Sequence, residues 1–243
     1  MTCKTPMSAA AAWVAATALA MAVSAVAAAP AAGDAAKDAL DAEQLVERAR
    51  LTVQSFAADT KMGQPVRDLL KKAKAVYIAP EVLRGAFIVG ASGGSGVLLV
   101  RGDKGAWNGP AFYTIGEASF GLQAGGDKSE VMLLIMSDRG VSSMLATSVK
   151  LGADASVAAG PVGGGTAAET ANVSADIVSY SRAKGLYAGA SLEGAVMKKR
   201  EGLNEAYYKK QDVTPTEILI KGTPVNTKAA PLKAEVNKLA GGK

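Results

Sequence analysis

The fold is best indicated by the stretch Asp176-Ile-Val-Ser-Tyr-Ser-Arg-Ala-Lys-Gly-Leu-Tyr-Ala-Gly-Ala-Ser-Leu-Glu-Gly194. Its second half alternates with a period of two, as a half-buried strand does. The face predicted to enter the core carries Leu186, Ala188, Ala190 and Leu192. A polar connection over residues 181–185 ends in glycine and joins this strand to an earlier alternating segment, residues 173–177. The stretch therefore predicts a hairpin of two antiparallel strands.

The composition excludes several kinds of catalytic and binding site. The chain of 243 residues contains no histidine, which excludes a Ser-His-Asp triad and a histidine metal site. The single cysteine, Cys3, lies near the N-terminus, so the predicted globular region has neither a disulfide nor a cysteine zinc site. We therefore expect no metal, no other cofactor and no enzymatic activity. The alternative is acid–base catalysis by two carboxylates facing a cleft, drawn from Asp154, Glu169, Asp176 and Glu193.

The overall charge does not indicate a nucleic-acid-binding protein. Lysine and arginine total 27 against 22 aspartate and glutamate residues, which is a weak bias. Aromatic residues make up 5% of the chain, too few for a platform on which bases could stack. We expect no nucleic-acid partner.

The first 29 residues are predicted to be a signal peptide. Lys4 precedes an uncharged, mostly apolar run over residues 8–29, and Ala25-Val-Ala27 suits a cleavage site. The run is also long enough to span a bilayer, so an uncleaved anchor is the alternative. Residues 30–38 are predicted to be an Ala-rich linker. We expect the mature protein to be exported, periplasmic or outer-envelope, and peripheral to the membrane.

The remaining chain predicts one α+β domain over residues 39–222. Two amphipathic helices are expected at residues 40–58 and 65–74, and a third at residues 138–148. Thr214-Pro-Thr-Glu217 is a capping box that begins a short C-terminal helix. Residues 223–243 are expected to form a polar tail.

About eight strands are predicted between the N-terminal and C-terminal helices. Many carry glycine or alanine on the apolar face, and many short strands with small residues favour a strongly coiled, barrel-like antiparallel sheet. We expect the N-terminal helices to pack on this sheet. Besides the hairpin, the expected strands are residues 75–79 (ended by Pro80), 83–89 and 96–101 (flanking the Gly-rich segment 90–96), 112–123, 131–136 and 150–157.

Five segments, in order, resemble those of the SYLF domain family. They are Ala73-Lys-Ala-Val-Tyr-Ile-Ala-Pro80, Gly85-Ala-Phe-Ile-Val-Gly90 with Gly93-Gly-Ser-Gly-Val97, Trp107-Asn-Gly-Pro-Ala-Phe-Tyr113, Leu151-Gly-Ala-Asp-Ala-Ser-Val157 and the hairpin quoted above. The resemblance covers about residues 40–222, which is nearly all of the predicted mature chain.

The resemblance implies a lipid-binding module without enzymatic activity. Eukaryotic members bind phosphoinositides, and the yeast actin-patch branch binds actin; those proteins also carry Src-homology or FYVE modules. The bacterial branch consists of exported lipid-binding proteins, often with a lipoprotein signal, in which the lipid-accepting cysteine follows the apolar run. Cys3 precedes the run in this chain, which departs from that pattern.

Two groups of cations flank the predicted β-rich core and are the candidate lipid-binding residues. Lipid phosphates attract basic side chains, each worth about 1 kcal/mol near an anionic surface. The first basic group consists of Lys61, Arg67, Lys71, Lys72 and Lys74. The second group consists of Lys198, Lys199, Arg200, Lys209 and Lys210. Arg182 and Lys184, in the predicted hairpin turn, are further candidates.

The sequence therefore predicts a phospholipid-binding protein of the bacterial envelope. Anionic lipid headgroups are the expected partner, and the two basic groups form a single patch if both fold to one side of the core. If they do not meet, they are two solvated helix faces. The alternative function is an envelope structural or host-interaction protein that binds a protein partner, whose identity the sequence leaves unknown.

Overall fold

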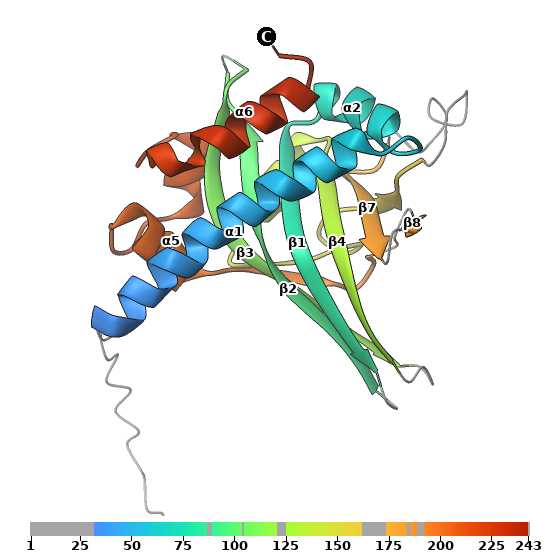
Figure 1. Ribbon diagram of the computed structural model, residues 1–243, viewed down its shortest axis with the longest axis horizontal. Helices are drawn as coiled ribbons and strands as arrows, with labels where there is room; N and C mark the ends of the chain where they lie inside the picture. The colour runs from blue at the N-terminus through green and yellow to red at the C-terminus, as the bar shows by residue number, and fades with distance from the viewer. Residues whose placement is uncertain are drawn as a thin grey trace, which may run out of the picture.

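Within the described residues, a curled sheet of nine strands, with helices packed against it, forms the centre of the fold (Figure 1). The computed structural model describes residues 32–86, 89–103, 105–120, 125–161, 174–183, 186–188 and 192–242. The strands are β1 (Ala75–Ala86), β2 (Val89–Arg101), β3 (Trp107–Phe120), β4 (Gly125–Ile135), β5 (Ser148–Lys150), β6 (Val157–Ala159), β7 (Ile177–Ala183), β8 (Leu186–Ala188) and β9 (Val196–Lys199). The predicted class, α+β with a strongly coiled sheet, is confirmed.

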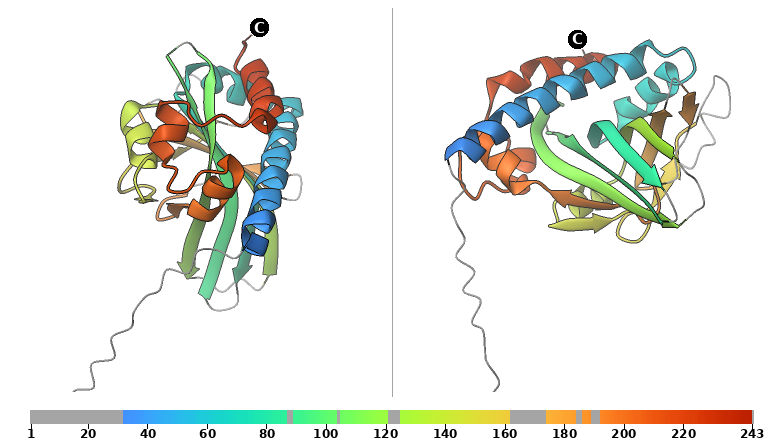
Figure 2. Two further views of the ribbon diagram at one scale, coloured as in Figure 1. Left: turned by 90° about the vertical axis from the view of Figure 1, so that its left-hand side faces the viewer. Right: turned by 60° about the horizontal axis from the view of Figure 1, so that its bottom comes forward.

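The helices lie in two groups on opposite sides of the sheet (Figure 2). One face carries α1 (Ala32–Ala58), α2 (Gly63–Lys72), α5 (Glu201–Tyr208) and α6 (Ala230–Leu239). The other side carries α3 (Asp138–Met144), where the Tyr113 hydroxyl donates a hydrogen bond to the Met144 carbonyl at 2.7 Å. A π-helical turn, η1 (Thr216–Ile220), and a 3₁₀ turn, η2 (Thr227–Ala229), connect α5 to α6.

The sheet curls so strongly that a short segment of chain connects its two edge strands. The strand order is β5-β9-β3-β2-β1-β4-β7-β6, with β8 paired to β7. β5 and β6 stand at opposite ends of this order, yet only residues 151–156 separate them in the sequence. Six residues reach at most about 20 Å, so the two edges lie close together. All neighbouring strands are antiparallel except β6 and β7, which run parallel.

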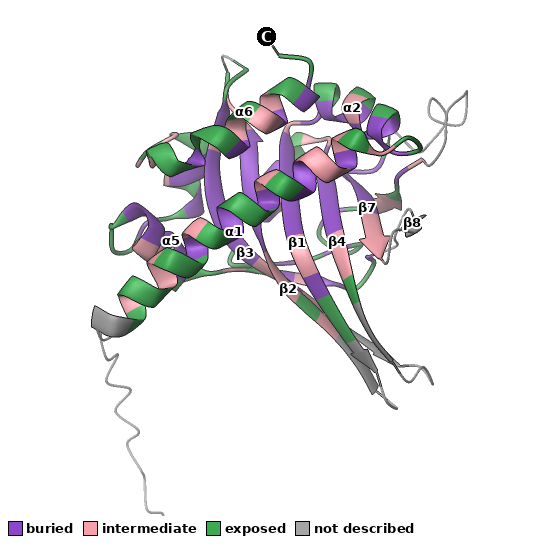
Figure 3. Cartoon of the chain, viewed as in Figure 1, coloured by how far each residue is buried: buried purple, intermediate pink, exposed green. Residues whose placement is uncertain are grey.

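The central strands are buried on both faces where the helices cover them (Figure 3). Residues 75–79 of β1 and 131–135 of β4 are buried without alternation. This pattern is expected for strands packed on both sides, and the apolar run at residues 131–136 predicted it. β1 to β4 continue beyond the helices, where Leu83 and Arg84 are exposed.

Pro80 does not end the first strand as predicted. The pairing of β1 shifts register between Ile78 and Glu81 on one side and between Ala79 and Val82 on the other, so Pro80 lies in a bulge that needs no N–H donor. The Gly-rich segment, residues 90–96, does not interrupt the sheet either, but forms part of β2. A Cβ at Gly94 would come within 2.2 Å of the Glu81 carbonyl oxygen, which only glycine avoids.

Helices extend beyond both ends of the predicted domain, residues 39–222. Helix α1 begins at Ala32, so most of the expected linker is helical. The expected polar tail contains η2 and α6, and its buried residues Leu232, Val236 and Leu239 belong to the main hydrophobic core. Their spacing of four and three residues is the stripe of a core-facing helix, which the intervening lysines obscure. Residues 1–31, including the predicted signal peptide, lie outside the described part of the chain.

The quoted stretch forms two antiparallel strands as predicted, but the first strand lies later in the sequence and the connection is tighter than expected. β7 covers residues 177–183, whereas the strand was predicted at residues 173–177. Ala183 pairs with Leu186, so two residues join β7 to β8 rather than five. Leu192 is buried as predicted, whereas the side chains of Leu186, Ala188 and Ala190 lie outside the described residues.

The strand predicted at residues 150–157 is instead a turn. The Lys150 amide donates to the Asp154 carboxylate at 2.7 Å, and Gly152 adopts a φ of 89°. The side chain of Asp154 and the positive φ of Gly152 stabilise this turn, so the chain does not form the strand that the alternation of apolar and polar residues predicted.

Candidate functional site

The first basic group, Lys61, Arg67, Lys71, Lys72 and Lys74, lies on and beside α2, at the C-terminal end of α1, and we call it the α2 cluster. The Arg67 guanidinium donates to the Ala57 carbonyl at 2.9 Å, which attaches α2 to α1. Lys71 is paired with Asp68 at 3.0 Å, and hydrogen bonds from Lys71 and Gln64 hold the pKa of the Asp68 carboxyl below its usual value. Lys74 is paired with Asp138 of α3. Exposed pairs of this kind contribute about 0–1 kcal/mol and exchange readily for another anion.

Helix α6 brings a further cation to the α2 cluster. Lys238 and Arg67 line the same pocket, of about 490 Å³, where α1, α2 and α6 meet. Lys71 lies beside Gly241, at the end of α6. Lys238 and Lys72 are exposed and make no ion pair within the described residues. We call this combined region, the α2 cluster together with Lys238, the α2–α6 surface.

Lys238 is the functional candidate that the sequence prediction missed. It was assigned to a polar tail outside the domain, whereas α6 packs against α1 and α2. The signal that identifies it is the buried stripe of Leu232, Val236 and Leu239. A helix that packs on the core places its intervening lysines on a defined surface.

The second basic group, which we call the β9–α5 cluster, lies near the other end of α1. Lys199 is paired with Glu201 at 2.8 Å, and Lys210 with Glu217 at 2.9 Å. Arg200 donates to the Ser95 hydroxyl at 2.8 Å. Lys198 and Lys209 are exposed. Two of the five cations are thus matched by neighbouring carboxylates.

The structure does not bring the two basic groups together. A pocket of about 470 Å³ places residues 35–39 of α1 beside Lys209 and Lys210 of the β9–α5 cluster. The α2–α6 surface adjoins Ala57 and Ala58, about 20 residues further along the same helix. At 1.5 Å per residue, about 30 Å separates the two groups. They are separate candidate surfaces rather than one patch.

Arg182 is half-buried between α1 and the sheet rather than presented on a basic surface. It pairs with Glu130 of β4 beneath α1, and its guanidinium lies 5.8 Å from the centre of the Phe56 ring. Glu130 also accepts a hydrogen bond from Thr52 of α1 at 3.0 Å. Arg182 therefore links α1 to the sheet, and we remove it from the candidates. Lys184 lies outside the described residues.

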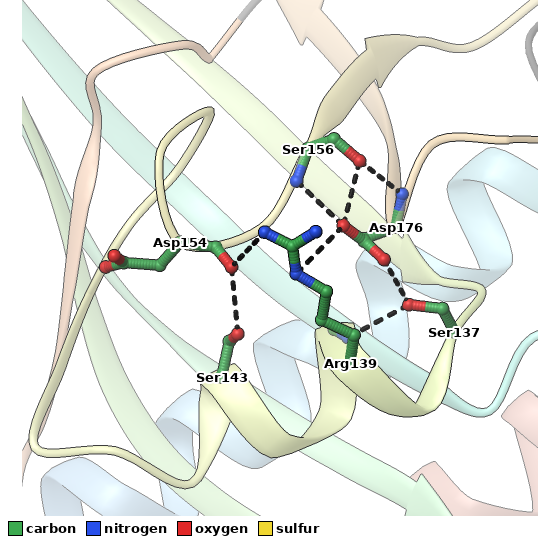
Figure 4. Close-up of polar contacts among 7 residues, drawn as sticks. Ser137, Arg139, Ser143, Asp154, Ser156 and Asp176 are labelled. Atoms are coloured by element: carbon green, nitrogen blue, oxygen red, sulfur yellow. Dashed lines mark hydrogen bonds and ion pairs between the residues drawn. The ribbon is translucent and has the colours of Figure 1, made fainter.

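Asp176, at the start of the quoted hairpin, organises a buried polar junction (Figure 4). Its carboxylate accepts from the Ser137 hydroxyl at 2.5 Å, and from the Ser156 amide and hydroxyl at 3.0 and 2.8 Å. These bonds, led by that of Ser137, hold the pKa of Asp176 below its usual value despite burial. Arg139 adds a longer ion pair at 3.9 Å. Ser137 in turn accepts from the Gly140 amide and caps α3.

Two of the four carboxylates considered for catalysis, Asp176 and Asp154, have structural roles. Asp176 ties α3, β6 and β7 together, and Asp154 closes the turn between β5 and β6. Glu193 lies against Gly152 of that turn, and Glu169 lies outside the described residues.

Within the described ranges, no three metal-ligating residues converge on a common point. In the same ranges, no helix has the length and apolar character needed to cross a bilayer.

Comparison with known proteins defines the class. A family model described as "Ysc84: Las17-binding protein actin regulator" matches residues 116–239. The human SH3 domain-containing YSC84-like protein 1 is 32% identical over 184 residues, which cover 73% of this chain and 53% of that protein. An SH3 domain-containing protein of Schizosaccharomyces pombe is 33% identical over 174 residues, covering 70% of this chain and 40% of that protein.

These relatives are longer than the part of them that this chain matches. Protein YSC84 of Saccharomyces cerevisiae is 33% identical over 160 residues, covering 64% of this chain and 33% of that protein. The chain spans about half the length of its human relative. The chain belongs to the Ysc84 family, whose shared module is the SYLF domain.

Proposed function

We propose that this SYLF domain is a peripheral, non-enzymatic protein that binds anionic phospholipid through the α2–α6 surface. The observation that carries the proposal is the convergence of cations from two distant segments beside an open pocket, with Arg67 and Lys238 in its wall. Lys61, Lys71 and Lys72 are exposed around this site. Each cation held near an anionic membrane contributes about 1 kcal/mol, so the group can hold the domain at the surface.

The α2–α6 surface is suited to bind a membrane by electrostatic attraction rather than by inserting apolar side chains into it. Among the described residues, the exposed large apolar side chains are Leu40, Leu51, Leu83, Ile220 and Val225, and none lies on α2 or α6. Binding without buried apolar side chains depends on charge alone and is therefore strongly screened by salt. With the export signal predicted at residues 1–29, the proposed place of action is the bacterial envelope.

Vesicle sedimentation tests the proposal. We expect the protein to sediment with vesicles that contain phosphatidylglycerol and to remain in solution with vesicles of phosphatidylcholine alone. Raising the salt concentration from about 0.1 M to about 1 M shortens the screening length from about 10 Å to about 3 Å, and should release the protein. Equal sedimentation with both kinds of vesicle at low salt would contradict the electrostatic mechanism.

A protein partner is the second candidate function. The matching family model names Las17 binding in its description, and the exposed ends of β1 to β4 offer surface outside the helix-covered core. Vesicles free of protein separate the two functions. Absence of binding to anionic vesicles at every salt concentration would favour the protein partner.

A further inference from the structure

A third pocket, lined by residues of α6 other than Lys238, has hydrogen-bond donors in its wall, one of them buried without an acceptor among the described residues. It has a volume of about 410 Å³ and lies between the turn that joins β2 to β3 and the first half of α6. Its walls are formed by Gly105, Ala106, Trp107, Lys233, Ala234 and Asn237. No sequence motif pointed to it, because its two halves lie about 130 residues apart.

Trp107 supplies the first unsatisfied donor. Its side chain is 4% exposed, and within the described residues its indole N–H has no hydrogen-bond acceptor. Leaving such a donor buried and unpaired costs about 1–3 kcal/mol. The cost is recovered when a ligand in the pocket supplies an acceptor oxygen.

Lys233 supplies the second donor, which is charged and half-buried. Burial lowers the pKa of its ammonium group, and no carboxylate of the described residues pairs with it. Desolvated cations in proteins are normally paired, so an unpaired one beside a pocket favours an anionic ligand. A water molecule would satisfy the indole N–H but would not balance this charge.

Arg101 adds positive charge beside the pocket and holds its wall in place. Its guanidinium lies 4.6 Å from the centre of the Trp107 ring. The same group donates to the carbonyls of Ala73 and Leu70 at 3.1 and 2.8 Å, at the C-terminal end of α2. Arg101 is therefore fixed by α2 and in turn fixes Trp107, so the pocket is formed before a ligand arrives.

We propose that this pocket binds a phosphate group through Trp107 and Lys233. A phosphate offers several acceptor oxygens and a negative charge, and the pocket has room for the glycerol that a lipid phosphate carries. The inference rests on the proposed function only for the source of the phosphate, which is either a phospholipid headgroup or a free phosphate ester. The site adjoins the α2–α6 surface through Arg101, so a membrane docked on that surface would present headgroups to it.

Trp107 itself reports on the site. The chain contains one other tryptophan, Trp13, so full-length protein with Trp13→Phe emits from Trp107 alone. Glycerol 3-phosphate is titrated at constant ionic strength, with chloride as the control ion, and phosphatidylglycerol vesicles are titrated separately. We expect a saturable change in emission that chloride does not produce. Lys233→Met should weaken the response about tenfold or more, because it keeps the side-chain length and removes the charge.

Lys221→Met, at an exposed lysine outside this pocket and outside both basic groups, is the matched control and should respond to glycerol 3-phosphate as the parent does. A response to glycerol 3-phosphate identifies a site for free phosphate esters, and a response to vesicles alone identifies a headgroup site; both support the proposal if Lys233→Met abolishes or weakens them. An emission change that Lys233→Met leaves intact, or no change with either ligand, overturns it. Sedimentation of Lys233→Met with anionic vesicles shows separately whether the proposed membrane binding stands.

Discussion

Reversing the charge of Lys71, Lys72 and Lys238 together is expected to lower the affinity for phosphatidylglycerol vesicles at least about 100-fold. Each lysine near the membrane contributes about 1 kcal/mol, and a glutamate in its place adds repulsion. Loss of about 3 kcal/mol or more corresponds to at least two factors of ten in affinity. All three side chains are exposed, so the fold should be retained. Vesicle sedimentation at low salt measures the change.

The β9–α5 cluster provides a control of equal charge. Reversal of Lys198, Lys209 and Lys210 changes the net charge by the same amount, about 30 Å away along α1. Each set also contains one lysine in a single exposed ion pair, Lys71 with Asp68 and Lys210 with Glu217. We expect the control to bind vesicles within a few-fold of the parent. Equal loss in both triple variants would show that net charge, and not the α2–α6 surface, attracts the membrane.

Asp176→Asn is expected to be the most destabilising of the single changes considered, by about 3 kcal/mol or more. The carboxylate accepts three hydrogen bonds from Ser137 and Ser156, and bonds to a charged acceptor are worth about 1.5–3 kcal/mol each. The asparagine amide would direct a donor at one of these donors. For a domain of this size, the loss corresponds to a fall in melting temperature of about 6–12 °C. Thermal unfolding followed by circular dichroism measures it.

Asp138→Asn is the matched control on the neighbouring helix α3. Asp138 is largely exposed and pairs with Lys74, so its removal should cost less than about 1 kcal/mol. If both variants unfolded at the same temperature, the junction drawn in Figure 4 would not have the role assigned to it.

The effect of Asp176→Asn should also depend on pH, with a definite sign. The pKa of Asp176 is lower in the folded protein than in the unfolded chain, where a carboxyl titrates near about 3.9. The stabilisation is therefore fully present above that unfolded value and is lost as the pH falls through the folded value. The difference in stability between parent and variant should be constant near neutral pH and shrink in acid.

Much of the fold could be predicted because alternation and apolar runs are local signals. The structure contains the helices predicted at residues 40–58 and 65–74, the buried strand at residues 131–136 and the capping box at Thr214 and Glu217. The predictions failed where a contact with a distant part of the chain outweighed a local sequence pattern. Pro80 is accommodated because both neighbouring strands skip it, which no reading of β1 alone reveals.

The candidate site was predicted only in part, because its composition depends on tertiary structure. The cations of α2 were identified from helical spacing, whereas their neighbour Lys238 depends on where α6 docks. Arg182 was assigned to an exposed turn because its partner Glu130 lies on another strand, 52 positions earlier. The pocket at Trp107 and Lys233 likewise requires the fold, since the two residues lie 126 positions apart and Lys233 belongs to no motif identified in the sequence.

The measurement that tests the central claim most directly places a reporter on each basic group. Lys72→Cys and Lys209→Cys, each in a Cys3→Ser background, carry one environment-sensitive nitrobenzoxadiazole dye and lose one lysine each. On addition of phosphatidylglycerol vesicles, the emission of the dye at position 72 is expected to rise and shift to shorter wavelength, while the dye at position 209 stays unchanged. A response at position 209 without one at position 72 would contradict the account.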